Sequence, residues 1–199
     1  MLRHQTIQHL QGLEVAPELT DITTLIPFLK SMKENLNFKY LKIVADAGYE
    51  SEENYSFIEE NNQISFIKPS NYEISKTRKY KNDISRIDNM DYDSESDLFI
   101  CQNSKKLIAN GVKIRKSKTG YESVKTIYIC EDCSNCNYKS QCIKGNNSKI
   151  PLEKRTKKFE TSKKFNRQRK EDLDLLLLIM LINYIIKYNI TELVSIYLS

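Results

Sequence analysis

Alternating helix-like and strand-like segments near the start of the chain restrict its fold more than any other feature. Residues 24–38 carry apolar side chains at the spacing of one helix face, and residues 52–61 follow a serine and begin with two glutamates, as helices often do. Residues 40–45 and 64–67 are short apolar runs of strand length. Because two strands joined through a helix are typical of a layered helix and sheet arrangement, we predict an α/β fold with a parallel or mixed sheet.

The middle of the chain, residues 68–129, has a different pattern, in which polar and aromatic side chains alternate. Turn-forming residues recur at Asn89, Asn103, Asn110-Gly111 and Thr119-Gly120. This pattern predicts a hairpin-rich insertion, with strands over residues 97–102 and 124–130.

Positive charge is concentrated in one segment of the chain. The whole chain carries +5, with 31 Lys and Arg against 26 Asp and Glu. Residues 139–170 alone carry +10, so the remainder of the chain sums to −5. Cations at this density favour an anionic partner, and lysines that neutralise phosphates give affinity without sequence information. Residues 68–86 also mix cations with aromatic residues, and a solvated charged face is the competing interpretation there.

A group of cysteines with the spacing C-x2-C-x2-C-x5-C is the strongest sign of a metal. It consists of Cys130, Cys133, Cys136 and Cys142. Thiolates two residues apart can converge on one borderline cation, which predicts a structural Zn²⁺ site, while Cys101 stands apart. The spacing also resembles the ferredoxin run, but the fourth cysteine is too distant and Ile143 replaces the usual proline, which disfavours an iron–sulfur electron carrier. A disulfide and unliganded thiols are the remaining alternatives.

Asp46 directly follows the first apolar run, in the sequence Asp46-Ala47-Gly48-Tyr49. In α/β proteins the ends of strands present catalytic or ligand groups, and carboxylates are suited to Mg²⁺. An aspartate in this place also commonly caps a turn or the next helix. The residues alone leave both interpretations open.

Taken together, these motifs resemble bacterial insertion-sequence transposases of the DDE type. The resemblance rests on Thr24-Leu25-Ile26-Pro27, on the segment from Ile43 to Tyr55 that contains V-A-D-A-G-Y, and on the cysteine cluster followed by the lysine-rich segment. It covers roughly residues 17–170 and is strongest for the branch with a cysteine cluster between the second and third catalytic carboxylates. It implies a ribonuclease-H-like core, partial in this chain, and an enzyme that cuts and rejoins DNA at insertion-sequence ends with two metal ions.

Roles for individual residues follow from this resemblance. Asp46 is expected to be the second carboxylate of the catalytic triad and to bind Mg²⁺, with Gly48 allowing a tight turn and Tyr49 packing near the DNA backbone. Several cations are expected to contact DNA: Lys154, Arg155, Lys157, Lys158, Lys163, Lys164 and Arg167. Assembly with further copies of the chain is also expected, as in transposition complexes.

The chain departs from the family pattern at both of its ends. The first catalytic aspartate is expected well upstream of Asp46, and the third carboxylate, a glutamate, on a helix after the basic segment. The chain instead continues into a leucine-rich run, and Glu171 lies too early. Because one carboxylate cannot hold two Mg²⁺ ions, we predict a truncated, catalytically inactive remnant. The alternative is a non-enzymatic, zinc-stabilised DNA-binding module formed by about the last two-thirds of the chain.

These features divide the chain into five expected segments. They are a partial ribonuclease-H-like core (1–67), a hairpin-rich insertion (68–129), the cysteine cluster (130–142), a basic DNA-facing segment (143–172) and a Leu/Ile-rich tail (173–199). The longest apolar run, Leu175 to Ile182, is far shorter than the ~20 residues that cross a bilayer, so the tail is expected to form a buried or frayed helix rather than a membrane span. Without a signal-peptide pattern after Met1, a cytoplasmic location is expected.

Overall fold

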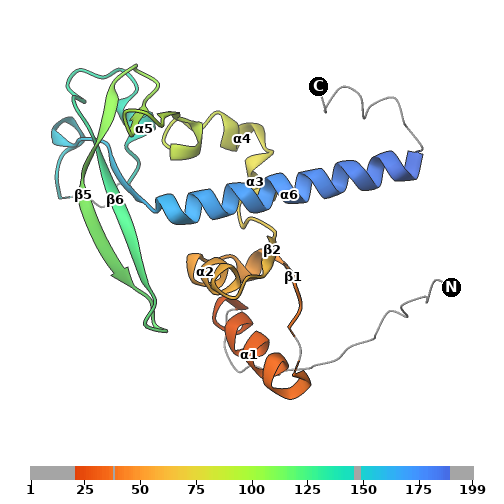
Figure 1. The fold of residues 1–199 in the computed structure, drawn as a ribbon. Helices are drawn as coiled ribbons and strands as arrows, with labels where there is room; N and C mark the ends of the chain where they lie inside the picture. Colours follow the sequence, from red (N-terminus) through yellow and green to blue (C-terminus); the bar gives the residue numbers. More distant parts are fainter. Residues whose placement is uncertain (1–20, 38, 146–148, 189–199) are drawn as a thin grey trace. The chain divides into compact units, whose positions relative to one another are not determined.

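The computed structural model describes residues 21–37, 39–145 and 149–188, which form two compact units (Figure 1). Unit 1 contains the described residues up to Lys68 together with those from Asp172 to Tyr188. Unit 2 contains Pro69 to Glu171. The boundary between Glu171 and Asp172 falls inside helix α6 (Lys163–Tyr188), so this helix contributes residues to both units. The five segments expected from the sequence remain a prediction.

Unit 1 confirms the predicted order of helices and strands. Its elements are η1 (Asp21–Thr23), α1 (Leu25–Leu36), β1 (Lys42–Ala45), η2 (Ala47–Tyr49), α2 (Glu52–Glu60) and β2 (Ile64–Ile67). Strands β1 and β2 pair in parallel, with Val44 opposite Phe66. The α/β class is therefore confirmed for this part of the chain, while Phe38, the end of the predicted first helix, lies outside the described residues.

The ends of α1 and α2 follow from their local sequences. The hydroxyl of Ser51 accepts a hydrogen bond from the backbone N–H of Asn54 at 3.1 Å, and two glutamates occupy the first turn of α2. The serine hydroxyl pairs with one of the N–H groups that have no partner within the helix, and the glutamates carry negative charge next to the positive end of the helix dipole. Helix α1 stops at Asn37, whose φ of 49° is left-handed, a conformation that asparagine tolerates.

Unit 2 is built on a five-stranded antiparallel sheet with the strand order β3-β4-β5-β6-β7. The strands are β3 (Asp91–Asp93), β4 (Leu98–Ile100), β5 (Lys106–Lys116), β6 (Glu122–Cys130) and β7 (Lys158–Thr161). Short helical turns fill the connections: α3 (Tyr72–Ser75), α4 (Arg78–Lys81), η3 (Ile87–Asn89), α5 (Lys139–Cys142) and η4 (Leu152–Lys154). The hairpins predicted between residues 97 and 130 are confirmed, whereas residues 72–89 are helical turns and not hairpins.

The predicted turn at Asn110-Gly111 is wrong. Both residues lie inside β5, where the pairing with β6 shifts register between Ala109 and Val112. Gly111 has a φ of +91°, the left-handed conformation that a β-bulge of this kind requires and glycine adopts at little cost. The real turn of this hairpin contains Gly120, with a φ of +94°, as predicted.

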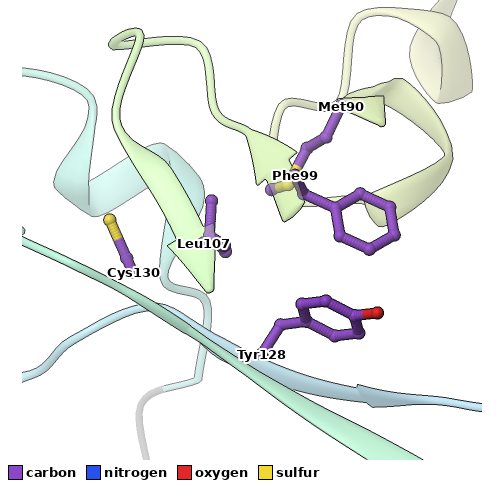
Figure 2. Packing of buried hydrophobic residues seen from close by; sticks show 5 residues of the cluster. All are labelled: Met90, Phe99, Leu107, Tyr128 and Cys130. Carbon is purple, nitrogen blue, oxygen red and sulfur yellow. The ribbon is translucent and has the colours of Figure 1, made fainter. Parts of the chain in front are cut away.

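The core of unit 2 is a small cluster of buried side chains on the sheet (Figure 2). It consists of Met90, Phe99, Leu107, Tyr128 and Cys130. The rings of Phe99 and Tyr128 meet edge to face with centroids 4.9 Å apart, a favoured geometry for an aromatic pair. Phe159 of β7 packs against the same rings, so residues from four strands form this core.

The leucine-rich tail is helical as far as Tyr188, which confirms the helix predicted there, and residues 189–199 lie outside the described part. Leu177 and Leu178 are exposed, so α6 is not buried at these positions. Within the part of the chain that the structure describes, no helix has the length and hydropathy needed to cross a membrane.

Candidate functional site

Asp46 lies where the sequence places it, directly after β1 and at the start of η2. Its side chain is exposed, and Oδ1 accepts a hydrogen bond from the backbone N–H of Ala47 at 2.7 Å. The backbone N–H of Tyr49 then donates to the Asp46 carbonyl at 3.1 Å, which closes the turn. Gly48 lies in this short helical turn and is not left-handed. In this structure Asp46 therefore caps a turn, and one of its carboxylate oxygens is used for that purpose.

Asn54 holds the turn after Asp46 in place. Its buried side-chain amide donates to the carbonyl oxygens of Tyr49 at 2.7 Å and Ile22 at 3.0 Å. Helix α2 thus fixes both η1 and η2 through a single side chain. This role was not predictable from the sequence, because an asparagine inside a helix gives no local sign of the carbonyl groups it will meet.

Two acidic residues near the start of the tail behave differently. Glu171 is exposed and pairs with Arg167 one helical turn earlier, at 3.0 Å. Asp172 is buried, and its carboxylate accepts hydrogen bonds from the Ser65 hydroxyl and from the backbone N–H of Ile67 at the end of β2. The sequence drew attention only to Glu171, whereas Asp172 is the buried one of the two.

Two of the seven basic residues expected to contact DNA form hydrogen bonds within the chain. The guanidinium of Arg155 donates to the carbonyl oxygens of Ile150 and Gly145 at 2.8 and 2.7 Å. The ammonium of Lys157 donates to the carbonyl oxygens of Ser85 at 2.6 Å and Cys142 at 3.2 Å. Both cations are thereby oriented toward the protein.

The other five expected DNA contacts are exposed. Lys163 pairs with Asp97 at 2.5 Å, and Arg167 pairs with Glu171. Burial raises the pKa of Asp97, but the bonds from Lys163 and from the hydroxyl groups of Tyr128 and Tyr92 outweigh it and hold that pKa below its usual value. Lys154, Lys158 and Lys164 are exposed and form no ion pair among the described residues.

Within residues 68–86, two cationic side chains lie over the rings of nearby tyrosines. The ammonium of Lys76 lies 3.7 Å from the centre of the Tyr72 ring, and the guanidinium of Arg86 lies 4.1 Å from that of Tyr80. Such cation–π contacts occupy the ring faces on which a nucleic-acid base would stack. This geometry favours the solvated charged face that the sequence left as the alternative.

A basic face of the long hairpin was not predicted from the sequence. Lys113 and Arg115 of β5 are directly opposite Lys125 and Ser123 of β6. Since side chains alternate along a strand, these four residues lie on one face of the sheet. Glu160 of β7 pairs with Arg115 at 2.9 Å and with Lys113 at 3.8 Å. Cations at alternate positions of a strand that ends in a glycine turn are the signal that could have found this face.

The cysteines occupy different environments. Cys130 is buried in the apolar core, and burial raises the pKa of its thiol to about 12. Cys133 lies in a turn, where its Sγ accepts a hydrogen bond from the backbone N–H of Lys157 at 3.3 Å. Among the described residues, no three His, Cys, Asp or Glu side chains are grouped so that they could hold a metal ion. The Zn²⁺ site at Cys130, Cys133, Cys136 and Cys142 and the Mg²⁺ site at Asp46 remain predictions.

The comparison with protein families identifies the segment that contains most of the sheet. Residues 100–176 match the family model described as a transposase DDE domain. The matched segment runs from the end of β4 into α6 and contains all five cysteines of the chain, whereas Asp46 lies outside it. No curated protein and no solved structure matches the chain. Such domains are generally ribonuclease-H-like, depend on divalent metal ions and act on DNA, and the match over residues 100–176 supports a DDE-type transposase fragment.

Proposed function

We propose that this chain is a DNA-binding part of a DDE transposase in which unit 2 contacts the phosphate backbone and Asp46 marks one position of the two-metal catalytic centre. The family match to residues 100–176 carries the proposal, because DNA is the substrate of that family. The parallel pair of β1 and β2, with Asp46 at its end, supports a partial ribonuclease-H-like core in unit 1.

The exposed cations of unit 2 are the proposed DNA contacts. Lys154, Lys158 and Lys164 come from η4, β7 and the first turn of α6, and all three are exposed. Phosphate contacts of this kind position a protein on DNA and weaken steeply with salt. Arg155 and Lys157 are assigned to the fold instead, because their donors are directed to backbone carbonyl oxygens.

Changing Lys154, Lys158 and Lys164 together to alanine tests this assignment. We expect weaker binding to duplex DNA of any sequence, because fewer phosphates are neutralised. The salt dependence of log K is expected to decrease by about 0.9 for each phosphate that the variant no longer neutralises. Fluorescence anisotropy with a labelled duplex at several salt concentrations measures both quantities.

The matched control changes three exposed lysines of unit 1, Lys30, Lys33 and Lys42, to alanine. This variant has the same net charge as the first one but keeps all of the proposed DNA-binding lysines, so its salt slope is expected to stay at the wild-type value. Equal slopes for both triple variants would show that only net charge matters and would contradict the assignment.

Catalysis by the chain itself is not expected. Asp46 is exposed and caps its own turn, and two Mg²⁺ ions need several carboxylates around them. We therefore expect no Mg²⁺-dependent nicking of a supercoiled plasmid or of end-sequence DNA above the background of an Asp46→Ala variant. Nicking by the wild-type chain that Asp46→Ala abolishes would show that the chain is an active enzyme.

Structural zinc is the remaining part of the proposal. Four cysteines with metal-binding spacing lie next to the proposed DNA contacts in the sequence, and Zn²⁺ bound there would stabilise the long connection between β6 and β7. The non-enzymatic alternative, a zinc-stabilised DNA-binding module, consists of this same part of the chain. Nicking by the wild-type chain would exclude this alternative, whereas the expected absence of nicking agrees with both interpretations.

A further inference from the structure

We propose that the free end of the β5–β6 hairpin is a second DNA-contacting surface of unit 2, and that its basic face enters the major groove of duplex DNA. We call this end the ribbon, and it comprises residues 113–116 and 122–125 with the turn between them. The inference rests on the proposed function, because it takes the same class of ligand. It adds contacts that Lys154, Lys158 and Lys164 do not include.

The ribbon is a two-stranded structure with open edges. Strand β4 pairs with β5 only from Lys106 to Ile108, and β7 pairs with β6 only from Thr126 to Ile129. Among the described residues, the two strands of the ribbon therefore pair only with each other, and Figure 1 shows β5 and β6 as a long pair of strands. Paired strands lie ~4.8 Å apart, and the ~12 Å wide major groove of B-DNA admits a two-stranded β-ribbon.

One face of the ribbon carries a group of cations. Lys113 is directly opposite Lys125, and Arg115 lies on the same face two positions further along β5. The side chains of Lys113 and Arg115 are 46% and 53% exposed. This face continues into the sheet, where Lys158 of β7 is opposite Ile129, four positions after Lys125 in β6. The ribbon therefore extends the basic surface to which Lys158 already belongs.

Glu160 is the carboxylate on this face that partly offsets its charge. The guanidinium of Arg115 donates from Nε and Nη2 to Glu160 Oε2 at 3.2 and 2.9 Å, and the ammonium of Lys113 lies 3.8 Å from Oε1. These ion pairs are exposed, and exposed pairs contribute little to stability. Phosphates can therefore replace the carboxylate as the partner of both cations at low cost.

The opposite face of the ribbon differs in chemistry. Val112, Ile114 and Val124 lie on it and are 68%, 63% and 54% exposed. Its two charged residues balance each other, because Lys116 is opposite Glu122 and pairs with it at 3.5 Å. Arginine and lysine can bind phosphates and also the O6 and N7 acceptors of guanine in the major groove. Charge complementarity with DNA thus selects the basic face.

The test measures binding of the full chain to duplex DNA and to duplex RNA of the same length by fluorescence anisotropy. The ribbon variant changes Lys113, Arg115 and Lys125 to glutamine. We expect its DNA affinity to fall at least ~10-fold at 0.1 M salt, and its salt slope to decrease by about 0.9 for each lost phosphate contact. The loss is expected to be larger for DNA than for RNA, because the deep, narrow major groove of A-form RNA does not admit the ribbon.

Two further variants act on the same hairpin and sheet. Changing Val112, Ile114 and Val124 to threonine keeps strand-forming residues on the other face and is expected to leave DNA affinity at the wild-type value. Glu160→Gln is expected to raise DNA affinity, because Arg115 and Lys113 no longer have a competing carboxylate. An increase in affinity cannot result from an unfolded ribbon, and circular dichroism of each variant reports on the fold separately.

Wild-type DNA affinity in the ribbon variant would overturn the proposal, as would equal losses for DNA and RNA or an equal loss in the threonine variant. If the alanine variant of Lys154, Lys158 and Lys164 still weakened binding in the first case, the proposed function would stand without the ribbon. A wild-type chain that binds no duplex DNA would overturn both.

Discussion

Replacing Leu107 by alanine is expected to lower the free energy of unfolding of unit 2 by about 2–5 kcal/mol. Leu107 is completely buried in the centre of the sheet, between Phe99 and Cys130 in the core cluster. The smaller side chain would bury less apolar surface and leave a cavity that the short strands around it cannot close. Because the cluster is small, few other side chains in it can compensate for the change.

Urea unfolding followed by near-ultraviolet circular dichroism measures this change, since the chain has 12 Tyr and no Trp and Tyr128 contributes to the core. Hydrogen exchange of β4 to β6 assigns the destabilisation to unit 2. The matched control is Ile114→Ala in the same strand, whose side chain is 63% exposed and whose removal is expected to change stability by less than about 0.5 kcal/mol. Equal effects of the two substitutions would contradict the assigned core.

Asp172→Ala is expected to cost unit 1 about 2–6 kcal/mol of unfolding free energy, since two donors lose their acceptor. The carboxylate is 2% exposed and accepts hydrogen bonds from Ser65 and from the backbone N–H of Ile67. Its removal would leave both donors without these acceptors in a buried place, and each unsatisfied group costs about 1–3 kcal/mol. Hydrogen exchange at the Ile67 amide is the direct measurement, because this N–H would lose its protection.

The control for this substitution is Asp174→Ala, two residues further along α6 and exposed. It removes the same charge and is expected to leave the Ile67 amide protected. Asp172→Asn adds a finer comparison, since the amide oxygen can still accept one of the two bonds and should restore part of the stability. If the Ile67 amide of Asp172→Ala exchanged as slowly as in the wild-type chain, the hydrogen bond from Ile67 to Asp172 would not anchor β2 to α6.

Local sequence was sufficient where the deciding interactions are local. The helix α2 was predictable because Ser51 and the two following glutamates act on its own first turn. The parallel pair of β1 and β2 was predictable from two short apolar runs separated by that helix. The bulge at Gly111 was not predictable, because the pair Asn-Gly fits a hairpin turn equally well. Only the pairing of β5 with β6 on both sides of this pair excludes a turn there.

The candidate site shows the same division. The cysteine spacing indicated a metal, and the local charge together with the family resemblance indicated a basic DNA-facing segment. Neither feature distinguished the individual cations of that segment. Arg155 and Lys157 differ from Lys154 and Lys164 in the carbonyl groups that the folded chain places near them. For Lys157 such a partner is the distant residue Ser85, so no local pattern marks it.

By itself, the sequence determined the α/β class, the hairpins around residues 97–130 and the resemblance to DDE transposases, because each depends on short motifs of neighbouring residues. Only the tertiary structure decided that Asp172 is buried against β2, that Cys130 is a core residue and that Cys101 lies beside the cysteine-rich turn. The physical reason is that burial and long-range strand pairing set these positions, and both are properties of the folded chain.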